Sequence, residues 1–121
     1  MRVVPFSPRW CWPLLLVAGT CVGLTSCDSL PWQRRATYAE ARAVVDLRCV
    51  ECHSEHNTNR AFPIAPQSVK LDTAAQMKQY AGRIQVRVVE ESTMPIVNMS
   101  GMTDEERALL GRWVKSGANI P

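Results

Sequence analysis

The chain has 121 residues, of which 46% are hydrophobic, 14 are basic and 11 are acidic, so it is long enough for one small domain. Its longest basic run in the chain's interior is Arg34-Arg35, and its aromatic residues are not interleaved with charge, which argues against nucleic-acid binding. A domain this small buries only a modest core and usually needs a staple such as a disulfide, a metal or a cofactor.

The first segment, residues 1–26, has the pattern of a secretory signal peptide. Two arginines precede an apolar stretch over residues 10–24, which is shorter than the roughly 20 residues needed to span a bilayer. Leu24-Thr25-Ser26-Cys27 closes this stretch and resembles the box at which bacterial lipoproteins are cleaved and lipidated. We therefore expect a lipoprotein-type signal peptide and a lipid on Cys27. An ordinary signal peptide or an uncleaved anchor is the alternative.

Cleavage before Cys27 would remove Cys11 and Cys21 and leave Cys27, Cys49 and Cys52. With lipid on the first of these and a cofactor on the other two, no thiol remains for a disulfide framework. The cleaved chain would carry 12 basic and 11 acidic residues, a net charge of +1, which says little about partners.

Residues 27–36 contain Pro31 and polar side chains and are expected to form a short tether. The domain follows over residues 37–121. Thr37 and Glu40 match a capping box, the arrangement that starts many helices. The next residues are rich in helix formers, so the first helix should run into Cys49. Residues 54–66 hold two prolines and two asparagines, a composition that predicts a loop.

A second helical segment starts at a cap on Asp72 or Thr73. Apolar residues then recur at three- and four-residue spacing as far as Val88. We expect Gly82 to split this segment into two helices. The segment should end before Pro95, because the residue preceding a proline is disfavoured in helical geometry.

After a loop over residues 96–102, Thr103 and Glu106 form another capping box. The final helix has one apolar side, and Gly117 is its expected stop. We expect Trp113 to pack this helix against the first. No strand signal of comparable strength occurs, so the fold class is predicted to be all-α.

The strongest motif is the pentad Cys49-Val50-Glu51-Cys52-His53. Cysteines at this spacing can each bond one vinyl group of a haem, and His53 then supplies a nitrogen to the iron. A zinc half-site would need two more ligands, of which only His56 is available after processing. A redox dithiol is expected in a βαβ setting, which is absent. The pentad therefore predicts one covalent haem c.

The second iron ligand decides between electron transfer and ligand binding. His56 is close in sequence to the proximal histidine and reads as a solvated loop residue. Met77 is expected in the core, and Met102 against its own helix. Met94 precedes a proline that stiffens its loop, so it is the predicted distal ligand, with Met99 of the same loop as the second choice.

Two further expectations concern the surroundings of the haem. The second ring nitrogen of His53 should be held by a backbone carbonyl of the following loop, with Pro63 and Pro66 as candidates. Candidate contacts to the haem or its propionates are Arg60, Arg83 and Asn98, although residues of these types more often lie at the surface.

Over about residues 37–117 the chain resembles the small monohaem cytochromes c with His/Met ligation. The resemblance rests on the pentad, on Met94-Pro95 in a late loop and on a terminal helix bearing Trp113. It implies an all-α, cytochrome c-like fold of three to five short helices around one covalent haem, with the terminal helices crossing near one haem edge.

A closer resemblance is to the cytochrome c domain at the C-terminal end of bacterial membrane-bound urate hydroxylases. In that family the domain takes electrons from urate oxidation. The catalytic membrane portion has no counterpart here, so the resemblance implies a stand-alone electron acceptor and does not identify urate as the donor. The matching runs are Ala65-Pro66, Leu71-Asp72-Thr73, Ala81-Gly82-Arg83-Ile84, residues 94–103 and Glu106-Arg107.

Together these features predict an electron carrier and not an enzyme, held by the lipid on Cys27 at the periplasmic face of the bacterial inner membrane. Its partners would be redox proteins, such as a membrane oxidoreductase or a terminal oxidase. The alternative is a haem-based sensor or small-ligand binder with an open distal position. A peroxidase is disfavoured because no spare distal histidine exists.

Overall fold

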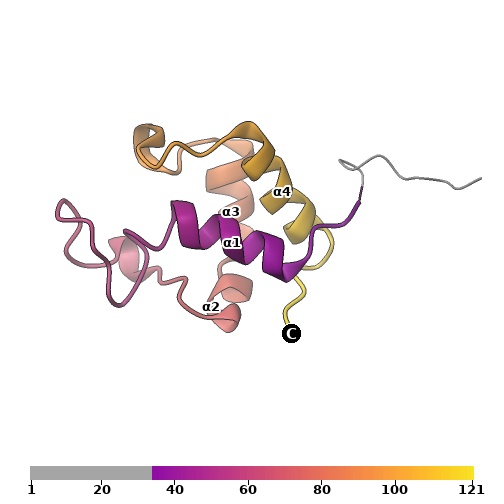
Figure 1. The fold of residues 1–121 in the computed structure, drawn as a ribbon, viewed down its shortest axis with the longest axis horizontal. Helices are drawn as coiled ribbons and strands as arrows, with labels where there is room; N and C mark the ends of the chain where they lie inside the picture. Colours follow the sequence, from indigo (N-terminus) through magenta and orange to yellow (C-terminus); the bar gives the residue numbers. More distant parts are fainter. Residues whose placement is uncertain (1–33) are drawn as a thin grey trace, which may run out of the picture.

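The computed structural model describes residues 34–121, and every regular element in that range is helical (Figure 1). This confirms the predicted all-α class for the described part of the chain. The signal peptide predicted over residues 1–26, the lipidation at Cys27 and most of the tether at 27–36 lie outside the described residues. The elements are α1 (Tyr38–Arg48), the 3-10 turn η1 (Pro66–Ser68), α2 (Ala74–Gln79), α3 (Ala81–Ile84), the wide π-type turn η2 (Gln85–Glu90), the 3-10 turn η3 (Ile96–Asn98) and α4 (Asp104–Lys115).

The two longest helices, α1 and α4, begin at the predicted capping boxes. The Thr37 hydroxyl accepts from the Glu40 N–H, and the Glu40 carboxylate accepts from the Thr37 N–H at 2.9 Å. Thr103 and Glu106 repeat the arrangement at the start of α4. Each box satisfies N–H groups that the first turn of a helix leaves without partners. Both starts are therefore local properties of the sequence.

Helix α4 ends as the sequence predicts. Gly117 follows the cap residue with φ of +103°, a left-handed conformation that costs glycine little. Its N–H donates to the Val114 carbonyl at 2.9 Å, and the next N–H donates to the Trp113 carbonyl at 3.0 Å. These two bonds satisfy carbonyls that the end of the helix would otherwise expose.

Helices α1 and α4 pack against each other in opposite directions. Arg48, in the last turn of α1, binds Glu106 in the first turn of α4, with Nε and Oε2 3.0 Å apart. At the other end, the start of α1 and the end of α4 lie on the same side of the molecule (Figure 1). Helix α4 also packs against η2 and α3, so it connects α1 to the α3–η2 segment.

The middle segment breaks at a different residue from the one predicted. Thr73 caps α2, with Gln76 completing a capping box, but the helix turns at Tyr80 and Gly82 lies inside α3. A glycine within a helix costs about 1 kcal/mol relative to alanine. Burial of the adjacent Ala81 and Ile84 offsets that cost, so the glycine does not end the helix.

The core lies between α1, α4 and the α2–α3 segment. Trp113 is fully buried in the same apolar cluster as Ala41 of α1, as predicted, and its indole N–H donates to the Asn119 carbonyl at 3.0 Å. Met77 and Met102 are buried in this cluster, which confirms their predicted packing roles. The largest fully buried side chains are Trp113, Met77, Leu110 and Val45.

Candidate functional site

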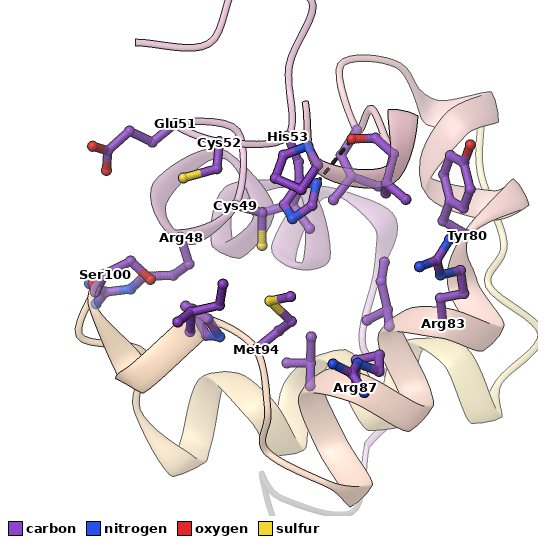
Figure 2. Close-up of a pocket in the computed structure, with 18 of the residues that line it drawn as sticks. Arg48, Cys49, Glu51, Cys52, His53, Tyr80, Arg83, Arg87, Met94 and Ser100 are labelled. Carbon is purple, nitrogen blue, oxygen red and sulfur yellow. Dashed lines mark hydrogen bonds between the residues drawn. The ribbon is translucent and has the colours of Figure 1, made fainter. Parts of the chain in front are cut away.

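The pentad lies immediately beyond the end of α1. Cys49 is the C-cap residue of that helix, and its carbonyl accepts from the N–H groups of Cys52 at 3.1 Å and His53 at 2.9 Å. These bonds continue the turn of the helix for four more residues. They bring the two thiols and the imidazole to one end of α1 (Figure 2).

The His53 ring is held by a backbone carbonyl, but the acceptor is Val69. The Nδ1 atom lies 3.0 Å from the Val69 oxygen, so the prediction of Pro63 or Pro66 is wrong. A carbonyl can only accept, so Nδ1 is the donor in this contact, and Nε2 is the ring nitrogen left to face another group. The Leu71 N–H also donates to the His53 carbonyl at 2.8 Å. This bond places residues 69–71 beside the pentad.

The pentad forms one wall of an open cavity with about 1080 Å³ of free space, part of which is open to solvent. Most of the other walls are apolar, and they come from α1, the loop after the pentad, the α3–η2 segment, the η3 loop and α4. The apolar lining residues outside the pentad are Val45, Phe62, Pro66, Val69, Leu71, Ile84, Val88, Met94, Pro95, Ile96, Met99 and Leu110.

Two methionines reach this cavity, and they differ in burial. Met94 is partly buried, and Figure 2 shows its sulfur pointing into the cavity toward Cys49, with His53 on the opposite side. Met99 also lines the cavity, but it is 53% exposed. His56 is exposed and does not line the cavity, as predicted for a solvated loop residue.

Arg107 of α4 holds the backbone at Met94. One of its terminal nitrogens donates to the Met94 carbonyl and to the Val88 carbonyl, each at 2.7 Å. The Met94 N–H in turn donates to the Arg87 carbonyl at 3.0 Å. Both sides of the Met94 peptide are therefore tied to helical segments, which fixes where its side chain starts.

The other end of the Met94 loop is held by Arg48. Its guanidinium binds the Ser100 carbonyl and the Glu106 carboxylate at the same time. Asn98 braces the same stretch, because its side chain donates to the Met102 carbonyl at 3.0 Å and accepts from the Met102 N–H at 2.9 Å. Asn98 does not line the cavity, so its observed role is to shape the loop.

A polar stripe borders the apolar wall made by Ile84 and Val88. Tyr80, Arg83 and Arg87 recur at three- and four-residue spacing and all line the cavity, as Figure 2 shows. Of these three residues, only Arg83 was predicted from the sequence as a haem contact. The helical spacing of the other two was the signal that could have found them. Arg60, the other arginine predicted as a haem contact, is exposed and does not line the cavity.

The two thiols lie in surroundings that disfavour ionisation. Burial raises the pKa of the Cys49 thiol to about 12. Burial, with a smaller contribution from the neighbouring Glu51 carboxylate, also raises the pKa of Cys52. Reactive dithiols instead have thiol pKa values lowered by positive charge or a helix N-terminus, so this environment is not that of a redox dithiol.

Within residues 34–121, no cluster of three or more His, Cys, Asp or Glu side chains is arranged to hold a metal ion. No helix in the same range is both long and apolar enough to cross a membrane. Comparison of the chain with protein-family models, with curated proteins and with solved structures gave no match.

Proposed function

We propose that this protein is a monohaem c-type cytochrome with a cytochrome c-like fold, an electron carrier and not an enzyme. One haem c would be bonded to Cys49 and Cys52, with His53 and Met94 as the iron ligands. The observation that carries this proposal is the convergence of two thiols, an oriented imidazole and a thioether on one apolar cavity.

The residues that line the cavity fit such a group. The apolar walls suit the faces of a porphyrin, and the thiols of Cys49 and Cys52 suit thioether bonds to its vinyl groups. The contact of the His53 Nδ1 with the Val69 carbonyl orients the ring and leaves Nε2 as the nitrogen that would bind iron. The polar side chains of Tyr80, Arg83 and Arg87 suit the carboxylates of a porphyrin.

The Met94 loop favours electron transfer over the binding of small ligands. When bound, a haem supplies an iron that cycles between ferric and ferrous states, and methionine with histidine raises its potential. The clamp on the Met94 carbonyl by Arg107 fixes the backbone from which the methionine side chain reaches the cavity. A haem-based sensor would instead need the iron site facing Met94 to be free for a small ligand.

We further propose that the protein works on the periplasmic side of the bacterial inner membrane, anchored by lipid on Cys27. Two observations support this location. The pentad is typical of covalent haem attachment, and cleavage before Cys27 would leave only one cysteine besides Cys49 and Cys52. Its partners would be redox proteins, either a membrane oxidoreductase that donates electrons or a terminal oxidase that accepts them. The resemblance to the urate hydroxylase domain supports the role of a stand-alone acceptor.

Covalent attachment is tested with protein from a host that matures c-type cytochromes. The wild type should be coloured and should keep its pigment in acid acetone. A variant with Cys49→Ala and Cys52→Ala should release any pigment it holds, because both thioether bonds are gone. Colourless wild-type protein, or pigment extracted from it by acid acetone, would overturn the proposal.

The distal ligand is tested by a matched pair of methionine variants. Met94→Ala should abolish the weak far-red absorption band that a methionine–iron bond gives the ferric state, and it should lower the reduction potential. Met99→Ala, in the same loop, should leave both unchanged. Loss of the band in Met99→Ala alone would reassign the ligand, and its absence in the wild type would favour the sensor.

A further inference from the structure

Another hollow in the described part of the chain lies at the opposite ends of α1 and α4 from the Arg48–Glu106 pair. It encloses about 620 Å³, including space open to solvent, and its lining is Arg34, Arg35, Arg112, Lys115 and Ser116. Arg34 is paired with Glu40. Among residues 34–121, Glu40 is the acidic residue that forms an ion pair with one of these four cations. The hollow therefore keeps an excess of positive charge.

Helix electrostatics explain only half of this cluster. Arg112 and Lys115 belong to the last turn of α4, where cations are favoured by the helix dipole. Arg34 and Arg35 come from the segment that precedes α1, and the dipole of α4 gives no reason for them to lie there. The Arg112 Nε is buried and has no hydrogen-bond partner among the described residues, so one donor at this hollow is unsatisfied.

The position of the hollow says which anion it faces. Arg34 follows Cys27 by seven residues, a span of at most about 25 Å when fully extended and on the order of 15 Å for a flexible chain. If Cys27 carries lipid, as proposed above, the four cations are held close to the bilayer. Cations held there are attracted to anionic headgroups.

We propose that Arg34, Arg35, Arg112 and Lys115 form a surface that docks on the phosphate-bearing headgroups of anionic phospholipids. This surface lies at the tethered end of α1, whereas the pentad lies just beyond the other end of the same helix. Eleven residues of helix, about 16 Å at 1.5 Å per residue, separate the two. Docking therefore turns the cavity that holds Cys49 and Met94 away from the membrane.

The test uses the full chain with Cys27→Ser, so that no acyl group contributes, and measures its binding to sedimented vesicles. Vesicles of phosphatidylcholine are compared with vesicles that also contain phosphatidylglycerol. The leader carries Arg2 and Arg9 and is the same in every variant, so the comparison between variants isolates the four cations of the hollow. The preference for anionic vesicles should fall at least tenfold in Arg35→Gln with Lys115→Gln, since each cation at an anionic surface contributes about fivefold.

A charge-matched control replaces two cations elsewhere, Arg60→Gln with Lys78→Gln. Both pairs are exposed, so neither should impair folding, and an unchanged unfolding midpoint checks this. The control should keep the wild-type preference. Equal losses in the two pairs, or no preference in the wild type, would overturn the proposal. Loss of the preference in millimolar inorganic phosphate at constant ionic strength would also overturn it, because the site would then bind free anions.

The experiment is independent of the haem and of the acyl chain. A protein without pigment would contradict the proposed function and leave the vesicle comparison intact. The mass of the wild-type protein reports lipidation separately, because a chain without acyl groups, or one that retains residues 1–26, shows that the anchor is wrong.

Discussion

Two arginines that do not carry the proposed chemistry hold the loop that does. Arg107 donates from α4 to the carbonyl of Met94, and Arg48 donates from the end of α1 to the carbonyl of Ser100. Carbonyls that accept from a charged donor form stronger hydrogen bonds than those that accept from neutral groups. The loop over residues 94–100 is therefore fixed at both ends by long side chains from the terminal helices.

This arrangement predicts the effect of Arg107→Gln. The variant removes the donors to the Met94 and Val88 carbonyls, so the free energy of unfolding should fall by about 2 kcal/mol. The far-red band should weaken, because the thioether loses its fixed backbone. Urea unfolding and the ferric spectrum measure the two effects.

Arg60→Gln is the matched control for this variant. Arg60 is exposed, so the free energy of unfolding should change by less than about 0.5 kcal/mol. If Arg107→Gln kept both the band and the stability of this control, the clamp would have no role in holding Met94.

At the scale of elements, one carboxylate serves both the start of α4 and its contact with α1. Glu106 accepts from the Thr103 N–H at 2.8 Å and binds the Arg48 guanidinium. Burial alone would raise the pKa of Glu106, but the bonds from Arg48 and Thr103 outweigh it and hold the pKa below its usual value of 4.5. Protonation of Glu106 therefore weakens a helix start and a helix–helix contact together.

The sign of the pH dependence follows from this lowered pKa. The stabilisation from Glu106 is complete above about pH 4.5, the pKa in the unfolded chain, and is lost as the pH falls through the lower folded value. Glu106→Gln keeps the capping box, since glutamine serves at that position, and removes the charge. Unfolding free energies between pH 7 and pH 3 should decline less in this variant. Parallel profiles would show that the pair does not contribute.

At the scale of the whole molecule, the core and the cavity share side chains. Val45, Ile84, Val88 and Leu110 are buried in the apolar cluster and also line the cavity. A group that filled the cavity would complete the core and would supply the staple that small domains usually need. The same sharing means that a change in the core also changes the wall of the site.

Two helical leucines that differ in burial test how much core packing contributes to stability. Leu110 is fully buried in α4, whereas Leu47 of α1 is 64% exposed. Leu110→Ala should lower the free energy of unfolding by about 2–5 kcal/mol, and Leu47→Ala by less than about 0.5 kcal/mol. Chemical denaturation measures both. Similar losses in the two variants would mean that Leu110 does not support the core.

The sequence by itself determined features that depend on short-range chemistry. Capping boxes at Thr37 and Thr103 and the stop at Gly117 involve groups within a few residues of one another, so they were readable directly. The pentad is also local, because Cys49, Cys52 and His53 meet within one turn of chain. The burial of Met77 followed from helical periodicity.

Only the tertiary structure decided where distant segments meet. The carbonyl that holds His53 belongs to Val69 and not to Pro63 or Pro66, because the path of the intervening loop depends on contacts far apart in sequence. The turn at Tyr80, and the reach of Arg107 to the Met94 carbonyl, depend in the same way on packing between helices. Hydrogen bonds and apolar contacts across the fold outweigh local propensities of about 1 kcal/mol, and no spacing pattern in one segment records them.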